Sequence, residues 1–157
     1  MTDLFNRFDI DNITGVLRQR GRPYGIEFGD MSRLSNSRLA LETGEFARDH
    51  GDYHRVHMAL FKAYFTFGRD IGDRAVLRSV AGDCGLDPNE LMAALEEGRY
   101  TEQVRRGSDA ARRDKVTAVP TFIIRGCPAI TGAVNETLFR EALQGAAAAL
   151  SSATDNK

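Results

Sequence analysis

The residues of this sequence best suited to covalent chemistry are its two cysteines, Cys84 and Cys127. A cysteine thiolate attacks disulfides and binds soft metal ions, and reactive thiols are activated beside cations, at helix N-termini or in Cys-x-x-Cys pairs. The two cysteines lie far apart in the sequence, and no Cys-x-x-Cys pair is present. We therefore expect two structural thiols, no Cys84–Cys127 disulfide, and at most a secondary redox role for Cys127.

The three histidines could bind a metal ion only if they shared one helix face. His50, His54 and His57 have the spacing i, i+4 and i+7 that such a face requires. Gly51 interrupts this spacing, so we expect His50 to end one helix and the other two histidines to begin the next. The sequence therefore predicts no metal site, and it predicts no bound cofactor.

A proline precedes the short apolar run "TFII". Pro120 stands between Val119 and Thr121, and proline is tolerated at the first residue of a strand because no ladder hydrogen bond is lost there. An X-Pro bond is also the one peptide bond at which the cis form costs only about 0.5–1 kcal/mol. From these residues alone, a trans proline that opens a strand is the simpler expectation.

Apolar residues at helical spacing, separated by glycines and capping residues, predict helices through most of the first 115 residues. The expected helices cover residues 11–21, 36–51, 52–68, 72–85, 87–100 and 101–115, with a loop at 22–35. The residues predicted to cap or end helices are Asp73, Gly85, the Asp87–Pro88 pair and Asn135.

The residue composition and spacing change after residue 115. Residues 120–126 and 129–133 are rich in β-branched side chains and predict two strands joined as a hairpin, and residues 135–150 predict a last helix. The predicted fold class is α/β and mostly helical. We expect a helical domain at 1–115, a β-β-α segment at 116–150 and a disordered tail at 151–157.

The order of "VTAVPTFII", a turn, "AITGA" and "NETLFREAL" resembles the C-terminal part of a thioredoxin-fold protein of the DsbA type. Upstream, "NSRLALETGEFARDHG", "HMALFKAYFTFGRDIGD" and "VLRSVAGDCGLDPNEL" resemble the helical insertion of the cytoplasmic DsbA-like proteins called FrnE. These proteins are related to 2-hydroxychromene-2-carboxylate isomerase and the kappa-class glutathione transferases. The resemblance covers about residues 4–146 and implies a helical insertion followed by the hairpin and last helix of a thioredoxin-like fold.

The resemblance also implies roles for particular residues. Pro120 matches the cis-proline that opens a strand in the family, and Val119, Pro120 and Thr121 are implied to bind substrate. The backbone N–H and C=O of Val119 would pair with an extended chain, as in strand addition. Asn36 resembles an asparagine near the substrate cleft of the isomerase relatives and is a secondary candidate, with a helix cap as the simpler expectation.

The sequence departs from the family pattern at its start. The family places a Cys-x-x-Cys pair at the start of its first helix, after a first strand, and no cysteine occurs here before residue 36. We therefore expect the first strand, the first helix and the second strand of the thioredoxin-like domain to be absent, and we name no catalytic residue. A shortened product of a normal enzyme, a natural paralogue that keeps only a binding platform, and a partner chain that supplies the missing half all remain open.

The function implied by the resemblance is that of a DsbA-family thiol–disulfide oxidoreductase or isomerase, truncated and not active alone. One alternative is a non-catalytic binding or assembly module that uses the Val119–Pro120 platform. Another is a glutathione-dependent isomerase or transferase. The kappa-class relatives place a Ser-Asp pair where this chain has Ala133 and Val134, which argues against glutathione binding.

Composition and charge restrict the partners. The net charge is -1 and the pI about 6.3, so nothing predicts nucleic-acid binding. The sequence shows neither a signal-peptide pattern nor an apolar run long enough for a membrane span, so we expect a soluble cytoplasmic protein. A protein or a small thiol is the expected substrate. An uncovered strand edge at "TFII" predicts homodimerisation through that edge or through a helical face.

Overall fold

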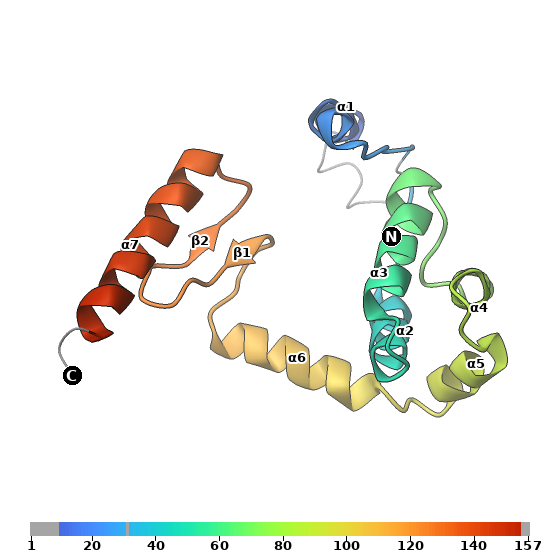
Figure 1. Ribbon diagram of the computed structural model, residues 1–157. Coiled ribbons are helices and arrows are strands. Elements are labelled where there is room, and N and C mark those ends of the chain that lie inside the picture. The colour runs from blue at the N-terminus through green and yellow to red at the C-terminus, as the bar shows by residue number, and fades with distance from the viewer. Residues whose placement is uncertain (1–9, 31, 155–157) are drawn as a thin grey trace. The chain divides into compact units, whose positions relative to one another are not determined.

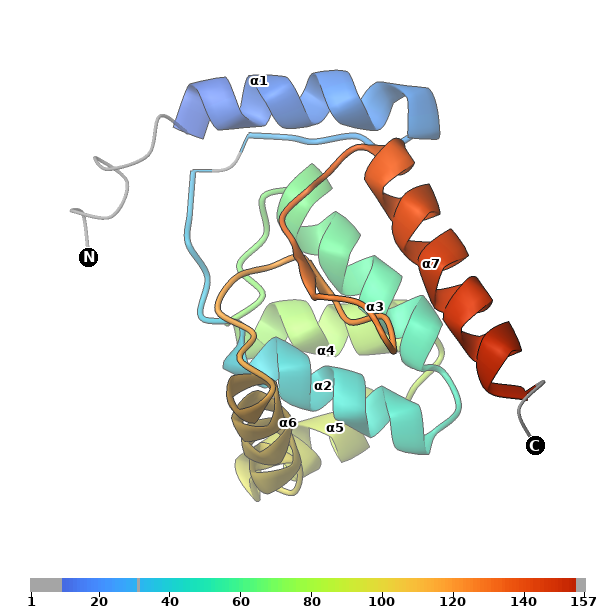
Figure 2. The ribbon, with the colours of Figure 1, turned by 90° about the vertical axis from the view of Figure 1, so that its left-hand side faces the viewer.

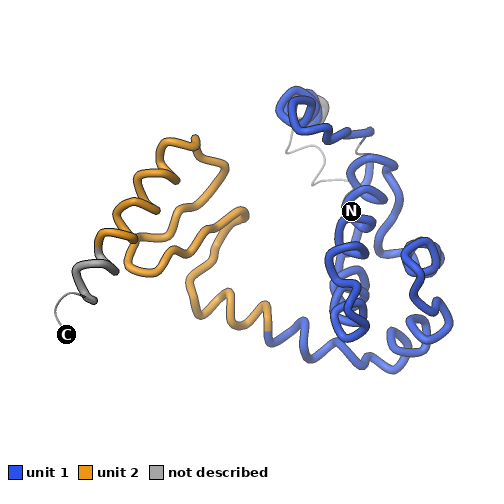
Figure 3. Tube along the Cα trace, in the orientation of Figure 1, with its two compact units in different colours: residues 1–106 blue, residues 107–157 orange. Residues whose placement is uncertain are grey.

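The computed structural model describes residues 10–30 and 32–154, and the chain divides into two compact units, residues 1–106 and 107–157 (Figure 3). We call them the helical unit and the C-terminal unit. Figure 1 shows their elements in chain order. The division falls inside helix α6 (Thr101–Arg113), and the domain boundary predicted between residues 115 and 116 stays a prediction.

The helical unit is built around one apolar core. The side chains of Phe46, Val56, Leu77 and Leu91 are at most 1% exposed, and each comes from a different helix. Burial of one such side chain contributes about 1.5–3 kcal/mol relative to leaving it in water. The four helices are α2 (Arg38–Asp49), α3 (Tyr53–Phe61), α4 (Arg74–Asp83) and α5 (Pro88–Glu96).

The capping residues act where the sequence places them. The Asp73 carboxylate accepts from the N–H of Ala75 at 2.8 Å, and α4 starts at the residue after Asp73. The Asp87 carboxylate accepts from the N–H of Asn89 at 2.8 Å, and α5 follows with proline at its first position. Gly85, with a φ of 78°, follows the end of α4. These three predictions are confirmed, because local hydrogen bonds at helix ends depend on few residues.

The region predicted as one helix, residues 52–68, has two parts. Helix α3 ends at Phe61 and continues as a π-helical turn, Lys62–Thr66, in which the N–H of Phe67 donates to the Lys62 carbonyl oxygen at 3.0 Å. The predicted loop before α2 contains a short 3₁₀ turn, Arg22–Tyr24, after helix α1 (Ile10–Gly21). Figures 1 and 2 show α1 lying across the C-terminal end of α3.

The first turn of α6 is attached to α2 by polar contacts. The Thr101 hydroxyl donates to Oε1 of Glu42 at 3.1 Å, and Arg38 Nε lies 3.6 Å from the same oxygen. Glu42 is 1% exposed, and its Oε2 has no hydrogen-bond partner among the described residues. The Tyr100 hydroxyl donates to Asp49 at 2.9 Å, so two polar contacts hold residues 100–101 against one face of α2.

The C-terminal unit is a hairpin against a helix. Strands β1 (Thr121–Phe122) and β2 (Ile130–Thr131) pair antiparallel, with Thr121 opposite Thr131. Both are shorter than predicted, because the N–H of Cys127 already donates to the Ile124 carbonyl oxygen in the turn between them. The hairpin packs on α7 (Glu136–Thr154), where the rings of Phe122 and Phe139 meet edge to face at 4.5 Å.

The last helix agrees with the sequence at its start and extends beyond its predicted end. Asn135 accepts from the N–H of Leu138 at 3.1 Å, which is the predicted cap. Helix α7 continues to Thr154, past the predicted end at residue 150, and residues 155–157 lie outside the described residues. The predicted fold class, α/β and mostly helical with a small antiparallel hairpin, is confirmed. Among the described residues, no helix has both the length and the apolar character needed to cross a membrane.

Candidate functional site

The segment that carries the predicted substrate residues is exposed, and a hydrogen bond within the segment fixes its backbone. The Val119 side chain is 88% exposed, and the Val119–Pro120 peptide bond is cis. The Thr121 hydroxyl donates to the Ala118 carbonyl oxygen at 2.6 Å, which ties the residues on either side of Val119–Pro120 together. The segment therefore presents an apolar side chain on a backbone fixed by its own hydrogen bonds.

The hydrogen bonds of the hairpin determine which backbone groups face outward. The N–H of Gly132 donates to the Pro120 carbonyl oxygen at 2.8 Å, on the β2 side of the strand. Successive residues of a strand direct their N–H and C=O groups to opposite edges, so those of Thr121 point away from β2. The sheet of the described residues has two strands, and this outer edge of β1 has no partner strand in it.

The outer edge of β1 is also apolar. Phe122 is 38% exposed and Ile123 is 63% exposed, next to the 88% exposed Val119. An edge that combines unpaired backbone groups with apolar side chains is a template for an added strand. Thr121 thus offers one donor and one acceptor, and Val119 and Ile123 offer apolar contact on either side of it.

The two cysteines are free thiols, as expected, and they belong to different units. Cys84 follows the last residue of α4 and is 3% exposed, and this burial raises the pKa of its thiol because the thiolate is poorly solvated there. Cys127 is half-buried in the hairpin turn, where its Sγ lies 3.3 Å from the Ala142 carbonyl oxygen of α7. Neither thiol has the features of an activated nucleophile, and the secondary role predicted for Cys127 stays a prediction.

Asn36 and the histidines have structural contacts in the helical unit. Asn36 Oδ1 accepts from the N–H of Arg38 at 3.1 Å, at the start of α2, and its predicted role near a substrate stays a prediction. His50 Nδ1 lies 2.8 Å from the Phe46 carbonyl oxygen at the end of α2, as its expected capping position requires. His57 packs between the rings of Tyr53 and Phe61, with centroids 5.2 Å and 4.5 Å away. The described residues contain no group of three or more metal-binding side chains.

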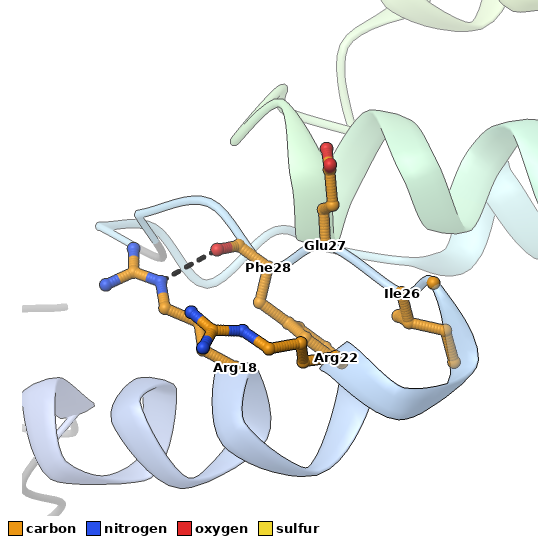
Figure 4. A pocket seen from close by; sticks show the side chains of 6 residues that line it. Arg18, Arg22, Ile26, Glu27 and Phe28 are labelled. Carbon is orange, nitrogen blue, oxygen red and sulfur yellow. Dashed lines mark hydrogen bonds between the residues drawn. The ribbon is translucent and has the colours of Figure 1, made fainter.

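A groove in the helical unit was not predicted from the sequence. It has a volume of about 690 Å³ and lies between the segment 24–28 and the end of α3 with its π-helical turn. A smaller hollow of about 340 Å³ is lined by part of the same segment together with Arg18 and Arg22 (Figure 4). The aromatic excess of residues 61–67, wider than one core-facing stripe needs, was the only local signal of this groove.

Two comparisons with known proteins agree with this description. A family model described as "DSBA-like thioredoxin domain" matches residues 10–144. The uncharacterized protein YwbO of Bacillus subtilis (strain 168) is 34% identical to this chain over 119 residues, which cover 75% of this chain and 59% of that protein. The chain therefore spans less than two thirds of the length of this curated relative.

Proposed function

Because this chain belongs to the DSBA-like thioredoxin-domain family, a family of the thiol–disulfide oxidoreductase type, we propose that its C-terminal unit is the substrate platform of such an enzyme. Val119, Pro120 and Thr121 form the platform, and an extended segment of a disulfide-containing or thiol-containing polypeptide is the ligand. The FrnE-type resemblance and a cytoplasmic location are part of this proposal, and the two free thiols fit a reducing compartment.

The main support for this proposal is that the outer edge of β1 has unpaired backbone groups in the described part of the chain. The N–H and C=O of Thr121 are directed to that edge by the pairing of Pro120 with Gly132. A substrate strand that added there would form backbone hydrogen bonds with Thr121, while Val119 and Ile123 would contact its side chains. Main-chain pairing of this kind accepts many sequences, which suits an enzyme that acts on disulfides in different proteins.

The thiols that exchange with the substrate are not assigned to this sequence. In disulfide exchange a thiolate attacks one sulfur of a disulfide, a new S–S bond forms, and the other sulfur leaves as a thiolate. Cys84 is buried, and Cys127, although only half-buried, has no second cysteine close in sequence that could resolve a mixed disulfide. We therefore propose that residues 1–157 alone bind substrate and do not turn it over, and that the thiol pair comes from outside these residues.

The platform can be tested with matched peptides. A fluorescent cysteine-containing peptide is N-methylated at every second residue on one strand edge, and a second peptide is N-methylated on the opposite edge. We expect one of the two to lose binding, because a methylated edge cannot donate to Thr121, while the other keeps the affinity of the unmodified peptide. Equal binding of both methylated peptides, measured by fluorescence anisotropy, would contradict strand addition.

Activity is tested separately, by the reduction of insulin with dithiothreitol. We expect the rate with residues 1–157 to equal the rate without protein. An accelerated rate that disappears in Cys127→Ser would refute the proposed inactivity and would assign the chemistry to Cys127.

A second candidate is a non-catalytic assembly module, in which the exposed apolar surface of the chain serves association. Val119, Ile123 and Phe67 are each more than 60% exposed, and exposed apolar patches mark interaction sites. Under this candidate the chain forms a homodimer, through the β1 edge or through a helical face. Sedimentation velocity at micromolar concentration separates a dimer from the 17.3 kDa monomer.

A further inference from the structure

The groove of the helical unit has the shape and lining of a docking surface. It has a volume of about 690 Å³, and its lining is mainly aromatic and aliphatic, including Tyr24, Ile26, Met58, Phe61, Phe65 and Phe67. We call this lining and its rim the groove face. Phenylalanine, tyrosine and methionine are enriched in the cores of protein interfaces.

The wall of the groove is held in place by contacts between distant residues. The N–H of Gly29 donates to the Phe65 carbonyl oxygen at 2.8 Å, and the Thr66 hydroxyl donates to the Glu27 carbonyl oxygen at 2.7 Å. The rings of Phe28 and Phe65 meet edge to face at 5.9 Å. The segment 24–29 is therefore attached to the π-helical turn, and the groove is a built feature of the unit.

The groove face carries both a hollow and protruding side chains. Tyr24 is 81% exposed and Phe67 is 68% exposed, and both stand at the groove. Ile26, Met58 and Phe61 are between 44% and 52% exposed. A face that presents exposed rings beside an apolar hollow can receive the rings of an identical face, because aromatic anchors bind in pockets.

The groove face carries a positive and a negative side chain, so the charges of one copy can match those of a second copy. Lys62 and Glu27 both line the groove, and neither side chain has an ion-pair partner in the described part of the chain. Figure 4 shows the Glu27 side chain directed away from the guanidinium groups of Arg18 and Arg22. In a two-fold interface every contact between two different residues occurs twice. If Lys62 of one copy pairs with Glu27 of its partner, Glu27 of the first copy therefore pairs with Lys62 of the partner.

We propose that the groove face binds a second copy of this chain in a two-fold symmetric dimer, with Phe67 or Tyr24 of each copy in the hollow of the other and two reciprocal Lys62–Glu27 pairs. This inference rests on the second candidate function and deepens it, because it assigns the homodimer to a face of the helical unit instead of the β1 edge. The substrate platform of the C-terminal unit does not depend on it.

The charge pairs allow a diagnostic experiment. Lys62→Glu and Glu27→Lys each place two pairs of like charges across the proposed interface. We expect each variant alone to weaken the dimer about ten- to a hundredfold in sedimentation velocity, since each exposed ion pair changes from attraction to repulsion. A mixture of the two variants restores the dimer, because both contacts of the mixed pair are attractive, and the double variant is a dimer by itself.

Matched controls separate this result from a general charge effect. Arg74→Glu and Glu96→Lys reverse exposed charges that lie outside the groove lining, and they should leave the dimer unchanged. Phe67→Ser should dissociate the dimer, whereas Leu41→Ser, which alters an apolar residue 51% exposed on α2, should not. Circular dichroism of each variant checks that it is folded.

Several outcomes would overturn the proposal. A wild-type monomer at micromolar concentration excludes this dimer. A dimer that persists in Lys62→Glu and Phe67→Ser, and is lost in Ile123→Asp, places association at the β1 edge. The dissociated Lys62→Glu variant should still bind the extended peptide. A wild-type dimer that does not bind the peptide would count against the substrate platform alone.

Discussion

Substitution of Gly29 by alanine is a direct test of how the groove wall is held. A Cβ atom at position 29 would lie 2.2 Å from the Thr66 carbonyl oxygen, whereas ordinary contacts of this kind begin at 3.4 Å. The nearby atom belongs to the backbone and cannot rotate away. The segment and the π-helical turn must therefore separate by roughly 1 Å, which would stretch the hydrogen bonds between them beyond their normal length.

The cost can be worked from the two hydrogen bonds that cross this contact. The Gly29–Phe65 bond of 2.8 Å and the Thr66–Glu27 bond of 2.7 Å would both be stretched or broken. Each bond contributes about 0.5–1.5 kcal/mol, so their loss costs about 1–3 kcal/mol. Alanine restores about 0.4–1 kcal/mol by restricting the unfolded chain, which leaves a net loss of about 1–2 kcal/mol.

Urea denaturation followed by circular dichroism measures this loss, and hydrogen exchange of the peptide covering residues 22–30 locates it. Gly15→Ala is the matched control, because Gly15 lies in α1 with no atom within 4 Å of the added Cβ. That variant should be more stable by about 0.5–1 kcal/mol, as expected for alanine in place of glycine in a helix. A Gly29→Ala protein with wild-type stability and unchanged exchange would refute the contact between the segment and the π-helical turn.

Further predictions concern single groups. Thr101→Val should destabilise the helical unit by about 1.5–3 kcal/mol in urea denaturation, because it removes a hydrogen bond to the buried carboxylate of Glu42; wild-type stability would show that this contact contributes nothing. In the native protein, Ellman's reagent should modify Cys127 rapidly. Cys84 should react only after denaturation, since burial raises the pKa of its thiol. A rapid reaction that survives in Cys127→Ser would contradict this. The Gly72 N–H, at 2.9 Å, and the Arg33 guanidinium lower the pKa of Asp70 below its usual value, so its contribution to stability is present above about pH 3.9 and is lost as the pH falls through the lowered pKa. The difference in unfolding free energy between wild type and Asp70→Asn should accordingly shrink on acidification, and a constant difference from pH 7 to the acid limb would refute the assignment.

The parts of the fold that could be predicted depend on residues close in sequence. Asp73, the Asp87–Pro88 pair and Asn135 each satisfy backbone N–H groups two or three residues ahead, so their roles follow from local chemistry. The hairpin was predicted from two β-branched runs and a turn with proline and glycine. Its strands are shorter than predicted because pairing depends on the partner strand, which a single run does not specify.

The contact between the π-helical turn and the segment 24–29 could not be predicted, because Gly29 and Phe65 lie 36 residues apart in the sequence. A π-helical turn shifts the backbone hydrogen bonds of an α-helix, and the Phe65 carbonyl oxygen here accepts from Gly29. The periodicity of residues 52–68 is compatible with one uninterrupted helix, and nothing in that stretch identifies Gly29 as the donor. The groove, which depends on the same contact, was missed for the same reason.

The candidate platform shows the same division between local and distant information. The resemblance directs attention to Val119 and Pro120, whereas the pairing of Thr121 with Thr131 shows that the backbone groups of Thr121 face the outer edge. Only the partner strand fixes the strand register. The register determines which of Val119, Pro120 and Thr121 can form backbone hydrogen bonds with an added chain. The platform belongs to the C-terminal unit and the groove face belongs to the helical unit. Substitutions in the platform should therefore leave the dimer intact, and substitutions in the groove face should leave peptide binding intact. A variant that loses peptide binding while it keeps its dimer, and another with the opposite behaviour, would therefore establish two separate surfaces on this chain.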